Sequence, residues 1–278
     1  MDRIPFGIAR LDSMIGGGAP AGSVVLLAGD LGAGAREFCY TSAAMNALAG
    51  IDESRFDLYY GDLAAEVTPP SAVHYLSFTD EPAAVRTEMD HVMEPDLLEG
   101  TADAIEFVDF SREYFRLTPV PTEWYAEETP DITALAETGE RRAVLEVFAE
   151  YLTAHAQENL VVVDSVTDLV SLSDDQAGTR DLTLLVNGLS RATHDWGGLV
   201  LLLANQESLH PRTLGRLKSS ADGTLSFEWE SGGSDRARTL VVEEFRGVLS
   251  RLEDEDIVRF ETEITDTGFD VSNVRKIR

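Results

Sequence analysis

The fold follows from Gly29-Asp30-Leu31-Gly32-Ala33-Gly34-Ala35-Arg36. The glycines have the spacing of G-x-x-x-x-G-K-[ST], a loop whose backbone N–H groups cradle phosphates. Ala35 stands where that pattern has the phosphate-binding lysine, and Arg36 stands where it has the hydroxyl that ligates Mg²⁺. We therefore expect the backbone cradle to remain without its lysine and its metal ligand.

The residues on either side of this loop predict a strand-to-helix junction. Residues 23–28 are a short apolar run typical of a buried strand, and residues 37–48 have the pattern of the helix that follows. A phosphate-binding loop requires this context, because the first turn of a helix offers unpaired N–H groups to an anion. The sequence predicts a nucleotide-binding fold that is a poor ATPase or none.

The chain is strongly acidic. It has 278 residues, of which 50 are acidic and 22 are lysine or arginine, for a formal net charge of −28. A field of this sign disfavours binding to nucleic acid or to an anionic membrane at ordinary salt. In concentrated salt, where the Debye length is about 3 Å or less, self-repulsion largely vanishes. We therefore expect a protein of a halophilic cytoplasm; the rival interpretation is an acidic surface that binds a partner.

The length and the cysteine content are typical of an intracellular α/β protein. We expect residues 1–278 to form a single domain with acidic insertions. Cys39 is the only cysteine, so an intrachain disulfide is impossible and a reducing compartment is indicated. Residues 1–5 lack the apolar segment of a signal peptide, and the longest apolar run, residues 199–204, is too short to span a bilayer. The expected location is the cytoplasm, without membrane insertion.

Strand-like runs alternate with helical periodicity through most of the chain, which predicts a mainly parallel sheet covered by helices. The expected strands are residues 23–28, 73–78, 105–109, 160–164 and 199–204. The expected helices include residues 140–157 and a segment that ends near Trp196, with Ser173 and Gln176 as a capping box at its start.

Three regions depart from this alternation. Residues 51–70 read as an acidic insertion, and residues 111–138, with three prolines, read as an irregular surface segment. Trp124 and Tyr125 in the second region either anchor a partner or pack on their own domain. From residue 225 onward the short alternating runs 225–230, 239–245 and 258–264 predict antiparallel strands, the first two joined by a turn at residues 231–235.

Five segments, in order, resemble the KaiC branch of the RecA-like P-loop ATPases. The first, residues 7–12 with 15–23, resembles the family's G-[IV]-x-x-L-D opening and its glycine-rich approach to the first strand. The phosphate loop is the second. The third, residues 75–82, resembles a strand ending in Phe-Glu-Glu-[ST]-Pro, where a carboxylate polarises the attacking water. Thr79 takes the place of the first glutamate and Asp80 that of the second, with Glu81 one residue further along.

The last two segments carry the metal and interface positions of that family. Residues 160–165 match the Walker B strand, and the resemblance implies that Asp164 supports Mg²⁺ in an active relative. Residues 241–247 resemble a strand ending in Lys-x-Arg-Gly, whose cations reach the nucleotide of a neighbouring subunit. Glu244 reverses the charge of that lysine, and Arg246 is kept.

The resemblance implies an α/β fold of the RecA/KaiC type, a mainly parallel β-sheet flanked by helices with antiparallel strands at the C-terminal edge. The replacements at Ala35, Arg36, Thr79 and Glu244 favour a pseudo-ATPase that acts as a regulatory or scaffold protein. Its partners would be proteins, including RecA/KaiC-like subunits or a second copy of itself, and ATP, ADP and Mg²⁺ would bind weakly at most.

Two other functions stay open from the sequence. One is a weakly active ATPase or autokinase that uses Arg36 with the carboxylates of Asp80, Glu81 and Asp164. The other is a recombinase accessory protein, which the net charge disfavours.

Arg36 itself has two interpretations. In the first interpretation its guanidinium, at the start of a helix, replaces both the lysine and the metal and binds phosphate without Mg²⁺. Alternatively it pairs with an acid such as Asp30 or Asp164 and closes the pocket, which is the interpretation we favour.

Overall fold

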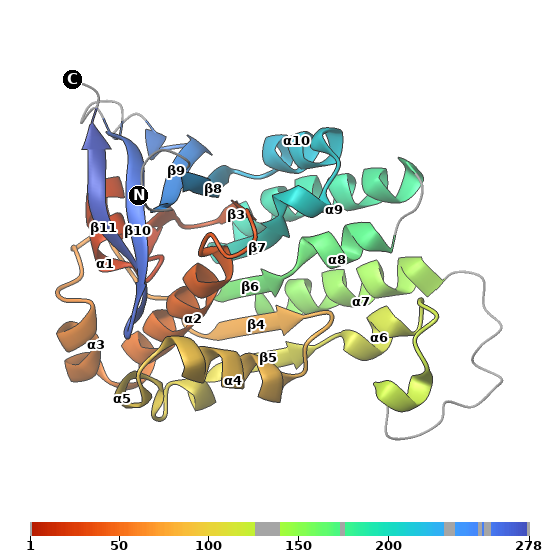
Figure 1. Ribbon diagram of the computed structural model, residues 1–278, viewed down its shortest axis with the longest axis horizontal. Helices are drawn as coiled ribbons and strands as arrows, with labels where there is room; N and C mark the ends of the chain where they lie inside the picture. Colours follow the sequence, from red (N-terminus) through yellow and green to blue (C-terminus); the bar gives the residue numbers. More distant parts are fainter. Residues whose placement is uncertain are drawn as a thin grey trace.

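The computed structural model describes residues 2–125, 140–172, 176–230, 237–249, 252 and 257–276. Within them, the chain folds around a nine-stranded sheet in the order β11-β10-β9-β8-β3-β7-β6-β4-β5 (Figure 1). The parallel strands are β3 (Ser23–Gly29), β4 (Val73–Ser77), β5 (Ile105–Asp109), β6 (Leu160–Asp164), β7 (Leu199–Asn205) and β8 (Gly223–Glu230).

Antiparallel strands extend the sheet beyond β8. They are β9 (Ala237–Phe245), β10 (Ile257–Thr265) and β11 (Gly268–Lys276). A separate two-stranded sheet joins β1 (Arg3–Ile4) to β2 (Ala19–Pro20). The predicted fold class, a mainly parallel sheet flanked by helices with antiparallel strands at its C-terminal edge, is confirmed.

Helices cover both faces of the sheet. One face carries α1 (Ala9–Ile15), α2 (Ala35–Ile51), α3 (Glu53–Tyr59), α4 (Pro82–Val92) and α5 (Pro95–Leu98). The other carries α6 (Ser111–Phe115), α7 (Glu140–His155), α8 (Val166–Ser171), α9 (Gln176–Trp196) and α10 (Pro211–Ser220). Short 3₁₀ turns lie at Ala102–Ala104, Thr122–Trp124 and Gln206–Ser208.

Alternation along the central strands divides the core between these two layers. Val25 and Leu27 of β3 pack toward the layer of α1 and α2, whereas Val24 and Leu26 pack toward the layer of α7 to α10. All four side chains are fully buried. A strand apolar on both faces is typical of a parallel sheet covered on both sides, and it explains why residues 23–28 read as a continuous apolar run.

The five parallel strands expected from the sequence are confirmed to within one residue at each end. Within the acidic insertion expected at residues 51–70, α3 forms with Asp52 as its N-cap and Phe56 buried, a helix that was not expected from the sequence. The expectation of an irregular segment from residue 111 was wrong at its start, where α6 forms and Tyr114 enters the core. The strand β11 was not expected.

Some expectations fall outside the described residues. These are the cap at Ser173, the turn at residues 231–235 and the part of the second insertion at residues 126–138. Just before that part, Tyr125 packs its ring 5.7 Å from that of Phe115, while Trp124 is 75% exposed. No helix in the described ranges is both long and apolar enough to cross a membrane.

Candidate functional site

The candidate site lies at the carboxyl end of β3, where the chain turns into α2. Gly34 has a φ of 109°, and a Cβ there would lie 3.0 Å from the ring of Phe269. A Cβ on Gly29 would lie 2.7 Å from the Cβ of Ala35. The loop therefore needs glycine at both anchoring positions of the motif, for conformation at one and for close approach at the other.

Side chains from distant strands hold the loop in place. Asp30 accepts a hydrogen bond of 2.8 Å from Nε2 of Gln206, which follows β7. Trp229 of β8 donates its indole N–H to the carbonyl of Leu31 at 2.9 Å. The contact of Gln206 comes from the β7 side of β3 and that of Trp229 from the β8 side, so the loop is held from both neighbouring strands. Neither donor was expected from the sequence.

Arg238 of β9 completes this support. Its Nε donates to the carbonyl of Gly32 at 2.9 Å, and its guanidinium carbon lies 4.7 Å from the centroid of the Trp229 ring. A cation over an indole face is attracted by the ring quadrupole. Arg238 thus binds loop backbone and aromatic ring together.

The loop borders a cavity of about 330 Å³. It is lined by residues 29–32 and 34–37 of the loop and α2, together with Ser165 and residues 203–205. Leu31, at the middle of the loop, is 69% exposed. The cavity has room for an anion, and its lining combines the loop glycines with larger side chains such as those of Leu31, Arg36 and Asn205.

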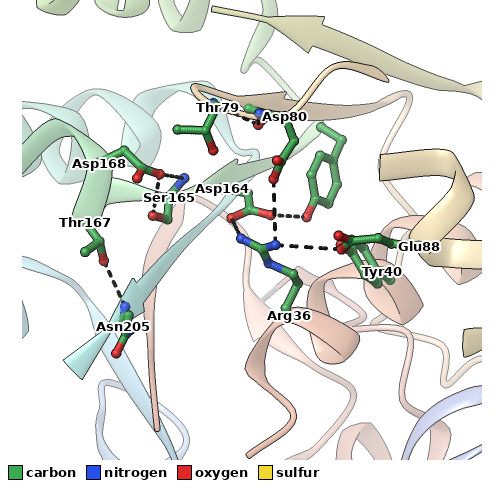
Figure 2. Close-up of polar contacts among 12 residues, drawn as sticks. Arg36, Tyr40, Thr79, Asp80, Glu88, Asp164, Ser165, Thr167, Asp168 and Asn205 are labelled. Atoms are coloured by element: carbon green, nitrogen blue, oxygen red, sulfur yellow. Dashed lines mark hydrogen bonds and ion pairs between the residues drawn. The ribbon is translucent and has the colours of Figure 1, made fainter. Parts of the chain in front are cut away.

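The side chain of Arg36 points toward Asp164 at the end of β6 (Figure 2). Its guanidinium donates to Oδ1 of Asp164 at 3.0 Å and lies 3.7 Å from carboxylate oxygens of both Asp80 and Glu88. Asp30, the other partner considered from the sequence, is bonded to Gln206 instead. Arg36 therefore pairs with Asp164, while the cavity beside the loop is still present.

Asp164 is a buried carboxylate that depends on this cation. Its side chain is 2% exposed, and its Oδ2 accepts a hydrogen bond of 2.7 Å from the hydroxyl of Tyr75 on β4. Burial raises the pKa of Asp164 above its ordinary value, and the charge of Arg36 and the hydroxyl of Tyr75 oppose that rise. Both carboxylate oxygens are thus occupied by protein donors.

These contacts do not fit a Mg²⁺ ion. Magnesium requires a near-octahedral shell of oxygen ligands at about 2.0–2.1 Å. Here the oxygens of Asp164 are bonded to Arg36 and Tyr75, and the position of the metal-binding hydroxyl holds a cationic side chain. The described residues also contain no group of three or more potential metal ligands.

The two carboxylates expected after β4 have different fates. The Oγ of Ser77 accepts the N–H of Asp80 at 2.9 Å, which turns Asp80 toward Arg36 (Figure 2). Glu81 is the exposed N-cap of α4 and makes no side-chain cap bond. The structure therefore brings Asp80, but not Glu81, to Arg36 and Asp164. Thr79 lies beside Asp80, with its N–H 3.3 Å from Ser77 Oγ.

Tyr40 and Glu88 complete the surroundings of Arg36. The Tyr40 hydroxyl, from α2, donates to Glu88, on α4. Tyr40 and Glu88 were not singled out from the sequence, because no motif marks them and because α2 and α4 are brought together only by the sheet. Figure 2 shows both side chains on the same flank of Arg36.

A second polar group lies across β6 from Arg36 (Figure 2). Ser165 caps α8, donating from Oγ to Asp168 at 2.8 Å. Thr167 Oγ1 accepts the N–H of Asn205 at 2.8 Å. These bonds join α8 to the end of β7, and they leave Ser165 and Asn205 in the wall of the loop cavity.

Glu244 and Arg246 lie away from this site. They are at the end of β9, where Phe245 pairs with Gly223 at the start of β8, whereas Gly29 is level with Phe227. Both are exposed, and Arg246 is 4.0 Å from Asp222. The phosphate loop of the same chain, residues 29–36, lies at the opposite end of the strands.

Comparison with known proteins supports the fold. No family model matches the chain, and no curated protein matches it in sequence. A crystal structure of a KaiC-like protein from the hyperthermophilic archaeon Pyrococcus horikoshii superposes with a TM-score of 0.62 at 17% identity, covering 98% of this chain and 99% of that one. The chain therefore has the KaiC-like RecA fold, the nucleotide-binding fold of P-loop proteins.

Proposed function

We propose that this protein is a P-loop protein that does not hydrolyse ATP and acts as a regulatory or scaffold partner of other proteins. One observation carries the proposal. Arg36 occupies the position of the metal-binding hydroxyl and directs its charge to Asp164, 3.0 Å away. The carboxylate that supports Mg²⁺ in an ATPase is paired here, inside the protein, with an arginine that stands in the place of the metal-binding hydroxyl.

The expected loss of nucleotide affinity is large. A charge-assisted hydrogen bond is worth about 1.5–3 kcal/mol, and the loop lacks both the lysine and the metal-binding hydroxyl of the motif. Two such losses would move a micromolar affinity to about millimolar or weaker. Phosphoryl transfer depends on charge stabilisation at these same positions, so hydrolysis would fall further.

The same reasoning predicts assembly without nucleotide control. Glu244 places a negative charge where the resemblance has an interface lysine, so it would repel the phosphates of a neighbouring subunit. Any assembly of this chain, with itself or with related subunits, would then form equally with and without ATP. The acidic composition supports a role in a salt-rich cytoplasm, where such a surface stays soluble.

A second candidate function rests on the loop cavity. A cavity of about 330 Å³ remains beside the helix start, and Arg36 is among its lining residues. A guanidinium that exchanged Asp164 for an anion would bind phosphate without Mg²⁺. This candidate requires that the anion compensate for leaving Asp164 buried without its cation.

Phosphate release from ATP tests the proposal. The wild type should release no more phosphate than an Asp164→Asn variant. The matched control is the double variant Ala35→Lys/Arg36→Thr, which restores both motif positions without changing net charge and is expected to bind Mg²⁺–ATP. Asp164-dependent release by the wild type at a rate near that of the restored variant would refute the proposal.

A further inference from the structure

Helices α9 and α10 are rich in basic residues, although the chain as a whole is strongly acidic. Together they hold five lysines and arginines against two acids, whereas the whole chain holds 22 against 50. The two helices lie side by side (Figure 1), and buried Leu217 of α10 and Leu189 of α9 belong to the same core cluster. Their outward arginines form what we call the α9–α10 basic surface: Arg180, Arg191, Arg212 and Arg216.

The arginines of this surface have no acidic partner in the described part of the chain. All four are exposed, and no ion pair joins any of them to a described carboxylate. Lys218 differs, since it is bound to Glu243 at 2.7 Å. In a chain with a large excess of acids, arginines on adjacent helices that have no described acidic partner leave a local positive field.

The spacing of these residues makes one continuous strip on each helix. Arg212 and Arg216 are four residues apart on α10, so they lie on one face about 6 Å apart along the axis. On α9, Arg180, Leu184 and Arg191 follow helical spacing on the outer face, and Leu184 is 57% exposed. The strip therefore combines guanidinium groups with an exposed apolar side chain between two of them.

We propose that the α9–α10 basic surface binds an acidic segment of a partner protein, with carboxylates on the arginines and an apolar side chain on Leu184. Guanidinium groups form forked hydrogen bonds with carboxylates. The Debye length is about 8 Å at 0.15 M salt and about 3 Å in concentrated salt, so a segment in direct contact with these helices is affected mainly by their own charges, five basic against two acidic. A nucleic acid, which extends far beyond the strip, meets the repulsion of the −28 charge.

A fluorescein-labelled glutamate-rich peptide containing one leucine tests this assignment by fluorescence anisotropy. In multimolar KCl, the condition of the salt-rich cytoplasm proposed for this protein, the full chain is expected to bind it, and the double variant Arg212→Glu/Arg216→Glu is expected to bind at least tenfold more weakly. The matched control is Arg112→Glu/Arg116→Glu. It makes the same change of charge at exposed arginines with the same spacing, at α6.

The possible outcomes separate clearly. Loss of peptide binding in the α10 variant alone, with unchanged thermal melting, supports the assignment. No binding by the wild type, or equal loss in both double variants, refutes it. Tighter binding of a labelled single-stranded DNA oligomer than of the peptide also refutes it. The titration contains no nucleotide, so its result is independent of whether the loop binds ATP.

Discussion

Replacing Arg36 with alanine would leave Asp164 buried without its cation. Removing one partner of a buried ion pair costs about 3–5 kcal/mol. The Arg36 side chain is 41% exposed, and Tyr75 would still donate to Asp164. We therefore expect the free energy of unfolding to fall by about 2–3 kcal/mol, less than for a fully buried pair.

The protein provides a matched control for this variant. Arg86 also pairs with a carboxylate at 3.0 Å, that of Asp103, but Asp103 is 86% exposed. Exposed pairs contribute about 0–1 kcal/mol. Although Arg86 also lies over the ring of Phe107, we expect Arg86→Ala to cost about 1 kcal/mol. The difference between the two costs therefore reflects mainly the burial of Asp164, since the other contacts of both arginines involve exposed or partly exposed groups.

A double-mutant cycle identifies the partner. Asp164→Asn removes the buried charge, so adding it to Arg36→Ala should recover part of the lost stability. We expect a coupling energy of about 1.5 kcal/mol or more between these positions. Urea unfolding at pH 7 in multimolar KCl, followed by circular dichroism, measures all four proteins. A cost for Arg36→Ala no greater than for Arg86→Ala, or a coupling near zero, would refute the reasoning.

Three other measurements concern the buried carboxylates and the assembly of the protein. Burial raises the pKa of Asp12 from 3.8 to about 7, so between those pH values the folded state holds a proton that the unfolded state has lost. The free energy of unfolding should therefore fall as pH rises through this window, by up to about 4 kcal/mol. In Asp12→Asn this pH dependence should vanish. A slope unchanged in that variant would assign the pH dependence to other groups. Tyr75→Phe removes the donor to Asp164 and should lower the free energy of unfolding in urea by about 1–2 kcal/mol. An unchanged free energy of unfolding would show that this hydrogen bond does not stabilise the protein. Light scattering should give the same molar mass with and without Mg²⁺–ATP, and a nucleotide-dependent mass would contradict the proposed independence from nucleotide.

The sequence predicted the parallel sheet because its signal is local. Residues 23–28 and 199–204 are apolar on both faces, and the structure buries them between two helix layers. The glycine spacing of the loop likewise reports local backbone requirements, confirmed by the close approach at Gly29 and the positive φ of Gly34. Such features need no knowledge of distant residues.

Other elements were missed because their patterns are short or interrupted. In β11 the alternation of Phe269 and Val271 breaks after a few residues, and the ladder with β10 has a register shift near Thr262. Helix α3 buries only Phe56 among acidic neighbours, so its composition resembles that of a loop. Neither segment has enough apolar periodicity to distinguish it from an irregular segment.

The site was only partly predictable because its contacts join distant parts of the chain. The sequence offered Asp30, Asp164 or a phosphate as the partner of Arg36. The structure selects Asp164, 128 residues away, because β6 lies one strand beyond β7 from β3. The same sheet order brings Trp229 and Arg238 to the loop. No spacing in the sequence indicates these pairings.

Arg36 pairs with Asp164 at 3.0 Å, and we propose that its charge is therefore not available to a nucleotide. Calorimetric titration of ATP and ADP in multimolar KCl, with Mg²⁺ and again with EDTA, distinguishes the two uses of this charge. We predict no heat of binding with either nucleotide, corresponding to affinity weaker than about 1 mM. Micromolar binding that survives EDTA and is lost in Arg36→Ala would contradict the account and show that the guanidinium binds phosphate.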